Sequence, residues 1–231
     1  LYLLLILSYS PIFTSSIFYI EGNTGSGKTT LLHALCERNP DFIGLEEPVE
    51  AVQNIDGINA LSLMYEDQER WALTGNLLYC VCHIERLKNI IATHPDRIIV
   101  SDRSLYSGRA FCFADKASGH LHPLEDIVYK RISAIAAASL PKPNGFIYIR
   151  TNPEVSYARI CTRKRSEESR VPFDYWHNLH KGHEHMLLID TATVGITPLL
   201  IVNYNENAQD NPQAIQQAVE KIETFIRAYA A

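Results

Sequence analysis

The sequence contains few cysteines, and they are scattered along the chain. Five occur in 231 residues, at positions 36, 80, 82, 112 and 161, and none forms a C-x-x-C pair. An odd, dispersed set argues against a disulfide framework and is typical of free thiols in a reducing compartment. We therefore expect a cytoplasmic location, with the mitochondrion as the alternative.

Long apolar runs and an excess of positive charge are also lacking. The strongest apolar run, residues 1–7, is too short to span a bilayer before Ser8 and Pro11 interrupt it. No Lys or Arg precedes Lys28, so the given residues show no clear cationic leader of a signal peptide. We predict an apolar N-terminal extension over residues 1–16 and no membrane partner. The net charge of −5 argues against a protein that grips a nucleic acid polymer.

The most informative motif that is present covers residues 22–29. It matches the phosphate-binding pattern G-x-x-x-x-G-K-[ST] and lies between an apolar run, residues 17–20, and a helix-compatible segment, residues 29–37. Lys28 can reach the terminal phosphates of a nucleoside triphosphate, and Thr29 can bind Mg²⁺. The predicted phosphate-binding residues are Gly22, Asn23, Thr24, Gly25, Ser26, Gly27, Lys28, Thr29 and Thr30.

Strand and helix patterns alternate along the rest of the chain. After residues 17–20, four further runs are typical of buried parallel strands: 41–46, 97–101, 145–150 and 198–204. Helices are predicted over 65–91, 124–140, 154–165 and from Pro212 through Ala230. This order indicates one α/β domain, residues 17–231, with a five-stranded parallel sheet and helices on both faces.

Charged residues follow two of the predicted strands, where sites collect in such sheets. Glu47 follows the second strand and can act as a general base, although an isolated acid there is also consistent with a solvated loop. Asp102 and Arg103 follow the third strand. Asp102 can bind Mg²⁺ and Arg103 can clamp phosphate oxygens, with a surface ion pair as the alternative.

A cationic segment lies at the end of the helix after the fourth strand. Arg159, Arg163, Lys164 and Arg165 are followed by two acids, of which the second is Glu168. A solvated helix face is one interpretation. The other is a short arginine-rich lid, about residues 159–170, which closes on the transferred phosphate.

In this order and spacing the motifs resemble the deoxynucleoside kinase family. That family includes deoxycytidine and deoxyguanosine kinases, mitochondrial thymidine kinase, insect deoxynucleoside kinase and, more distantly, herpesviral thymidine kinases. The matching residues are 21–30, 47–49, Tyr65, 69–71, 102–104, Tyr106, Ser107, Arg109 and 159–168. The resemblance implies a P-loop kinase fold, a homodimer, and Mg²⁺-dependent transfer of phosphate from ATP or another nucleoside triphosphate to a deoxynucleoside.

The resemblance also implies roles for residues at the matched positions. Glu47 is expected to be the general base on the nucleoside 5′-hydroxyl, Arg103 to orient that hydroxyl, and Lys28 to hold the transferred phosphate. Thr29 and Asp102 are the expected Mg²⁺ ligands.

Further roles concern the sugar and the lid. Tyr65 and Glu168 are expected to bind the sugar 3′-hydroxyl, and the expected lid arginines are Arg159, Arg163 and Arg165.

The base pocket departs from the family pattern. Asn76 stands where the family usually has Gln, and Val52 where many members have an aromatic residue. Tyr79 and His83 follow Asn76 on one helix face, with ordinary helix packing as the alternative. Gly108 replaces Asp or Ala and adds room; Phe111 or Phe113 is expected to stack on the base. Base preference stays open, with a slight lean to a pyrimidine or to broad specificity.

Two other functions are weighed. Thymidylate kinase shares the phosphate loop, but Val49 and Ser104 depart from its motifs. A structural accessory subunit with this fold would not require Lys28, Glu47, Asp102 and Glu168 together.

A histidine cluster is a further candidate. His177, His180, His183 and His185 are interpreted as solvated residues rather than as metal ligands.

Overall fold

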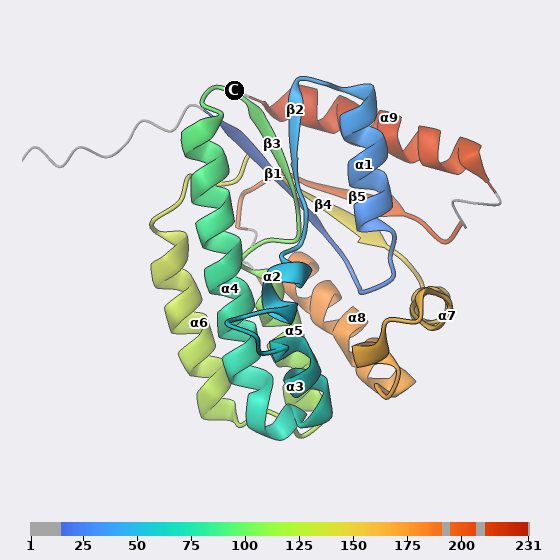
Figure 1. Ribbon diagram of the computed structural model, residues 1–231. Coiled ribbons are helices and arrows are strands. Elements are labelled where there is room, and N and C mark those ends of the chain that lie inside the picture. The colour runs from blue at the N-terminus through green and yellow to red at the C-terminus, as the bar shows by residue number, and fades with distance from the viewer. Residues whose placement is uncertain (1–14, 191–194, 207–210, 231) are drawn as a thin grey trace, which may run out of the picture.

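A sheet of five parallel strands forms the centre of the protein (Figure 1). The computed structural model describes residues 15–190, 195–206 and 211–230. The strands are β1 (Ser16–Glu21), β2 (Phe42–Leu45), β3 (Ile98–Asp102), β4 (Gly145–Arg150) and β5 (Leu199–Asn203), in the order β2-β3-β1-β4-β5. The predicted α/β fold with a five-stranded parallel sheet is confirmed.

Two apolar cores lie on opposite faces of the sheet, because side chains alternate along a strand. All six residues of β1 are buried. Ile17 and Tyr19 belong to one core, and Phe18 and Ile20 belong to the other. A strand buried on both faces needs helices on both sides.

The helices supply those two layers (Figure 1). On one face lie α1 (Lys28–Arg38) and α9 (Pro212–Tyr229). On the other lie α4 (Gln68–Thr93), α5 (Ser107–Ala117), α6 (Pro123–Ala137) and α8 (Phe173–Leu188). The shorter elements are α2 (Val49–Gln53), α3 (Ala60–Glu66), α7 (Pro153–Arg163) and a 3₁₀ turn, η1 (Ser166–Glu168). No helix among the described residues is long and apolar enough to cross a membrane.

The long helix predicted over residues 65–91 is two helices. Tyr65 belongs to α3, and α4 begins only at Gln68. Asp67 separates them, because its side chain accepts a hydrogen bond of 3.1 Å from the backbone N–H of Arg70 and so caps α4. Tyr65 therefore lies on a separate helix from the α4 side chains.

Smaller differences concern the ends of elements. Helix α7 ends at Arg163 rather than at residue 165, since Lys164 adopts a left-handed conformation with φ of 55°. Of the predicted extension over residues 1–16, residues 1–14 lie outside the described residues.

Candidate active site

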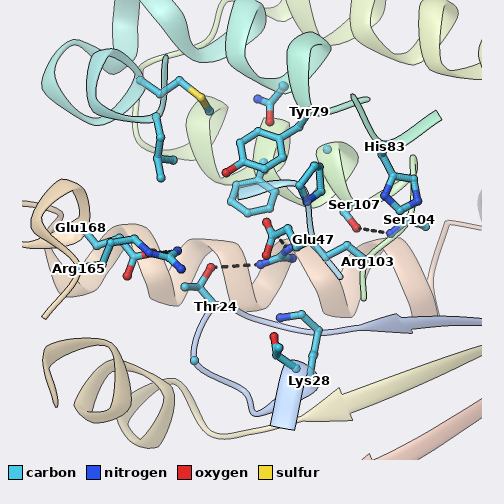
Figure 2. Close-up of a pocket in the computed structure, with 18 of the residues that line it drawn as sticks. Thr24, Lys28, Glu47, Tyr79, His83, Arg103, Ser104, Ser107, Arg165 and Glu168 are labelled. Carbon is cyan, nitrogen blue, oxygen red and sulfur yellow. Dashed lines mark hydrogen bonds and ion pairs between the residues drawn. The ribbon is translucent and has the colours of Figure 1, made fainter. Parts of the chain in front are cut away.

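A cavity of about 420 Å³ opens at the carboxyl ends of the strands. Its floor is the phosphate loop and the start of α1, and α3, α4 and α5 form its far end. Figure 2 shows Lys28 at one side of this space and Tyr79 and His83 at the other, with Glu47 and Arg103 between them. The cavity therefore joins the predicted phosphate site to the predicted base pocket.

The phosphate loop has the backbone that its glycines predict. Gly25 and Gly27 have φ angles of 76° and 98°, which residues with a Cβ rarely adopt. A Cβ on Gly25 would also lie 2.5 Å from the Ser156 carbonyl oxygen. Lys28 donates a hydrogen bond of 3.0 Å to the Asn23 carbonyl, and burial lowers its pKa to about 8. Lys28 is thus held at the loop, facing the cavity.

Thr29 and Asp102 meet at the edge of this loop. The Thr29 hydroxyl donates to Asp102 Oδ2 at 2.5 Å, and Asp102 is fully buried at the end of β3. Its Oδ1 has no hydrogen-bond partner among the described residues. Burial raises the pKa of Asp102 and Lys28 opposes that effect. A hydroxyl beside a carboxylate with an unused oxygen fits Mg²⁺, which prefers oxygen ligands.

Glu47 and Arg103 form an ion pair in the middle of the cavity (Figure 2). Arg103 Nε lies 2.9 Å from Glu47 Oε1. Burial raises the pKa of Glu47, but the charges of Arg103 and Lys28 outweigh it and hold the pKa below its usual range. Arg103 Nη2 also donates to the Thr24 hydroxyl at 3.2 Å. Glu47 is therefore ionised at neutral pH and able to accept a proton.

The backbone at Arg103 is unusual and is held by Glu21, which belongs to the matched segment 21–30 but was assigned no role. Arg103 has φ of 68°, a region that non-glycine residues rarely occupy. The fully buried carboxylate of Glu21 accepts hydrogen bonds from Ser104 at 2.5 Å and Ser107 at 2.7 Å, which fixes this turn. The available signal was the position of Glu21, an acid at the end of a buried strand.

The predicted sugar-binding residues line the same cavity from different elements. Tyr65 comes from α3 and Glu168 from η1. The pKa of Tyr65 is raised by burial and by the nearby charge of Glu168. Arg163 and Arg165 reach Glu168 at 2.6 Å and 2.9 Å, so in this structure both arginines pair with that acid.

Arg159 contacts the phosphate loop, whereas Arg163 and Arg165 contact Glu168. It donates hydrogen bonds of 3.3 Å and 3.2 Å to the carbonyls of Gly25 and Ser26, and one of 2.6 Å to the carbonyl of Glu206. Its guanidinium stacks on Tyr204. All three predicted lid arginines nevertheless line the cavity.

The predicted base-pocket residues are brought together, except for Val52 and Phe113. Those that line the cavity are Asn76, Tyr79, His83, Gly108 and Phe111. Burial lowers the pKa of His83 to about 4, so this histidine is neutral. Val52 is fully buried in α2 and does not line the cavity, because α2 packs against α3 and α4. Phe113 stacks on His185 instead, with ring centroids 5.5 Å apart.

Gly108 was expected to add space to the base pocket, but Tyr129 fills that space. Tyr129 from α6 lies against Gly108 so closely that a Cβ there would collide with the Tyr129 hydroxyl. That hydroxyl donates to the Leu105 carbonyl at 3.1 Å. Tyr129 therefore shapes the base end of the cavity. Because Tyr129 is far from Gly108 in sequence, no local pattern predicts this contact.

The four histidines of α8 lie in different environments. The interpretation of His183 as solvated is wrong, because its side chain is fully buried and its Nδ1 lies 2.9 Å from the Leu179 carbonyl oxygen. His177 stacks on Phe173. Within the part of the chain that the structure describes, no three His, Cys, Asp or Glu side chains are grouped to hold a metal ion.

Comparison with known proteins agrees with this geometry. The family model for deoxynucleoside kinase matches residues 18–227. Mitochondrial thymidine kinase 2 of Macaca fascicularis is 29% identical over 212 residues, which cover 90% of this chain and 78% of that protein. Deoxycytidine kinase 1 of Xenopus laevis is 29% identical over 237 residues, which cover 90% of this chain and 89% of that protein. The mitochondrial deoxyguanosine kinase of Xenopus laevis is 26% identical over 234 residues, which cover 90% of this chain and 88% of that protein.

Proposed function

The chain belongs to the deoxynucleoside kinase family, and from that premise we propose that it transfers the γ-phosphoryl group of ATP to the 5′-hydroxyl of a deoxyribonucleoside. The Glu47–Arg103 pair carries the proposal. It lies in one cavity with Lys28 of the phosphate loop on one side and Tyr65 of the sugar-binding pair on the other. A proton acceptor between a triphosphate site and a sugar site suits transfer to a hydroxyl.

Each of these residues has one role in the proposed mechanism. Glu47 accepts the 5′-hydroxyl proton while that oxygen bonds to the γ-phosphorus, and the bond to the β–γ bridging oxygen breaks to release ADP. Arg103 keeps Glu47 in place and offsets charge on the transferred group. Lys28 binds the β- and γ-phosphates. The 3′-hydroxyl is held by Tyr65 and Glu168, which fixes the direction of the 5′-hydroxyl.

Mg²⁺ and the lid complete the donor side. Thr29 and Asp102 would hold Mg²⁺, which when bound offsets negative charge on the phosphate oxygens. The cationic segment at residues 159–170 acts as a lid, and its arginines line the cavity beside the phosphate loop. ATP is the proposed donor, and other nucleoside triphosphates fit the same loop.

Turnover by a Glu47→Gln variant tests the function. We expect kcat to fall by about 10²–10⁴-fold, since the amide cannot accept the hydroxyl proton, while KM for the deoxynucleoside changes little. ADP release is measured with the four deoxynucleosides and with thymidine monophosphate as acceptors. Glu46→Gln is the matched control, because Glu46 is exposed and pairs with His33 outside the cavity. Parental turnover in Glu47→Gln with every deoxynucleoside contradicts the assignment.

A homodimer is the proposed assembly. Helices α4 and α6 pack side by side at one edge of the protein (Figure 1). Both carry exposed apolar residues. They include Val81, Leu124, Ile127 and Ile135, with exposed fractions of 49%, 60%, 47% and 75%. An exposed apolar surface that a second copy covers is typical of a dimer interface. We refer to these four residues as the α4/α6 face.

A further inference from the structure

Behind Asn76, on the side away from the cavity, lies a buried acid. Asn76 on α4 lines the cavity, whereas Asp115 on α5 does not, and Asp115 is only 3% exposed. Asn76 Nδ2 donates to Asp115 Oδ2 at 3.0 Å. The other carboxylate oxygen, Oδ1, accepts from the Tyr175 hydroxyl at 2.9 Å. Three helices, α4, α5 and α8, thus meet at this carboxylate.

This contact fixes which end of the Asn76 amide faces the cavity. An ionised carboxylate only accepts hydrogen bonds, so the NH₂ end must face Asp115 and Oδ1 must face elsewhere. Rotating the amide by half a turn would place two acceptor oxygens against each other in a buried site, which is strongly unfavourable. Asn76 therefore presents a carbonyl oxygen and its remaining N–H in one fixed arrangement.

The nucleobases divide into two classes at the edge that an amide pairs with. Thymine and guanine present a ring N–H beside a carbonyl oxygen, whereas cytosine and adenine present a ring nitrogen acceptor beside an amino group. The two patterns are the reverse of each other. An amide can pair with both classes only if it is free to rotate.

We propose that Asp115 is a positioning residue that locks the Asn76 amide, so that the base site accepts one of these two hydrogen-bonding patterns and rejects the reverse. The inference rests on the proposed function, since it concerns the acceptor of that reaction. Asp115 acts only through Asn76, because it does not itself line the cavity. The groups around it support this role, since Tyr65 and Cys112, like Tyr175, have pKa values raised by burial and stay neutral.

The Asp115→Asn variant tests the lock. Its side chain can donate as well as accept, so the Asn76 amide can turn and pair with either pattern. We expect the parent to discriminate between thymidine and deoxycytidine by about ten- to hundredfold in kcat/KM, and Asp115→Asn to bring the ratio to within about threefold of unity. Asp126→Asn is the matched control, because Asp126 is a buried acid that pairs with Lys116 and Lys130 outside the cavity.

A second readout needs no substitution. Burial raises the pKa of Asp115 to about 6, so the carboxyl is protonated at pH 5 and ionised at pH 8. A protonated carboxyl can donate to Asn76 Oδ1, and we expect the thymidine-to-deoxycytidine ratio of the parent to move several-fold towards unity at pH 5. Because both substrates share the same catalytic groups, the effect of pH on Glu47 or Lys28 cancels in the ratio.

The two proposals fail separately. Dissociation constants for all four deoxynucleosides are measured by calorimetry beside turnover, so a protein that phosphorylates none of them refutes the function, while the binding ratio still tests Asp115. A parent that treats both pyrimidines alike overturns the lock. So does an Asp115→Asn variant that loses stability and affinity for both in proportion, with an unchanged ratio at pH 5, because that result indicates a merely structural acid.

Discussion

Among single residues, Gly108 and Tyr129 show how closely the base end is fitted. The Tyr129 hydroxyl and ring occupy the space that any Cβ at position 108 would need. We expect Gly108→Ala to destabilise the protein by about 1–3 kcal/mol, because a buried tyrosine cannot move aside without strain. Chemical unfolding of the variant measures this loss.

The control for this prediction is a double-mutant cycle. Tyr129→Leu alone leaves a cavity and also destabilises the protein. If the two side chains compete for one space, the double variant loses less stability than the two single variants together, by about 1 kcal/mol or more. Strict additivity would mean that the collision at Gly108 is relieved in another way.

The site residues predicted from the sequence belong to a short motif or directly follow a strand. Gly25, Lys28 and Thr29 are close together in sequence and line one side of the cavity. Glu47 and Arg103 follow strand ends, so parallel pairing brings them together. The shape of the base end depends on contacts between helices far apart in sequence.

Asp115 and Tyr129 illustrate that limit. Asp115 meets Asn76 across 39 positions of sequence. Tyr129 meets Leu105 across 24. Neither pairing leaves a local pattern, because the packing of α4, α5 and α6 creates it.

Among helices and turns, the link between η1 and the α2–α3 segment is the clearest candidate for a latch. Glu167 Oε1 accepts hydrogen bonds from Gln53 at 2.8 Å and Asn59 at 3.1 Å. The hydrogen bond from Asn59 lowers the pKa of Glu167 to about 2, so the carboxylate is ionised throughout the working range. Through Glu167 the proposed lid is tied to the opposite wall of the cavity.

We expect Glu167→Ala to let the lid segment open more often. Losing about 1.4 kcal/mol of hydrogen bonding raises the open population about tenfold. Trypsin, which cleaves after Lys164 and Arg165, should then cut the variant about tenfold faster than the parent. Glu154→Ala on α7 is the control, because Glu154 is exposed. Equal cleavage of the Glu167 and Glu154 variants would refute the latch.

The elements themselves were only partly predictable. The strands were found because apolar runs buried on both faces are distinctive. Helix α5 was not predicted: it packs against α4, α6 and α8, and the residues that it buries include the polar Ser107 and Asp115. Gly182 permits the packing of α5 against α8, because a Cβ there would collide with the Ala110 carbonyl oxygen. Such close approach of two helices depends on tertiary structure, which a single segment does not encode.

At the scale of the whole molecule, the exposed α4/α6 face is the feature that favours assembly. Leaving Leu124, Ile127 and Ile135 in water is unfavourable, by about 25 cal/mol for each Å² of apolar surface. Association of two copies through this face removes that surface from water on both partners at once. The cavity opens at the carboxyl ends of the strands, so both active sites would stay accessible.

Light scattering after size-exclusion chromatography tests this assembly. We expect the parent to have twice the chain mass of 26.1 kDa. Ile135→Glu should give the single-chain mass, because a carboxylate buried in the interface without a partner is strongly unfavourable. Ile189→Glu is the matched control: Ile189 is 68% exposed at the end of α8, away from the α4/α6 face, and its variant should remain dimeric. A parent of single-chain mass, or an Ile135→Glu variant that still has the dimer mass, would show that this face has another role.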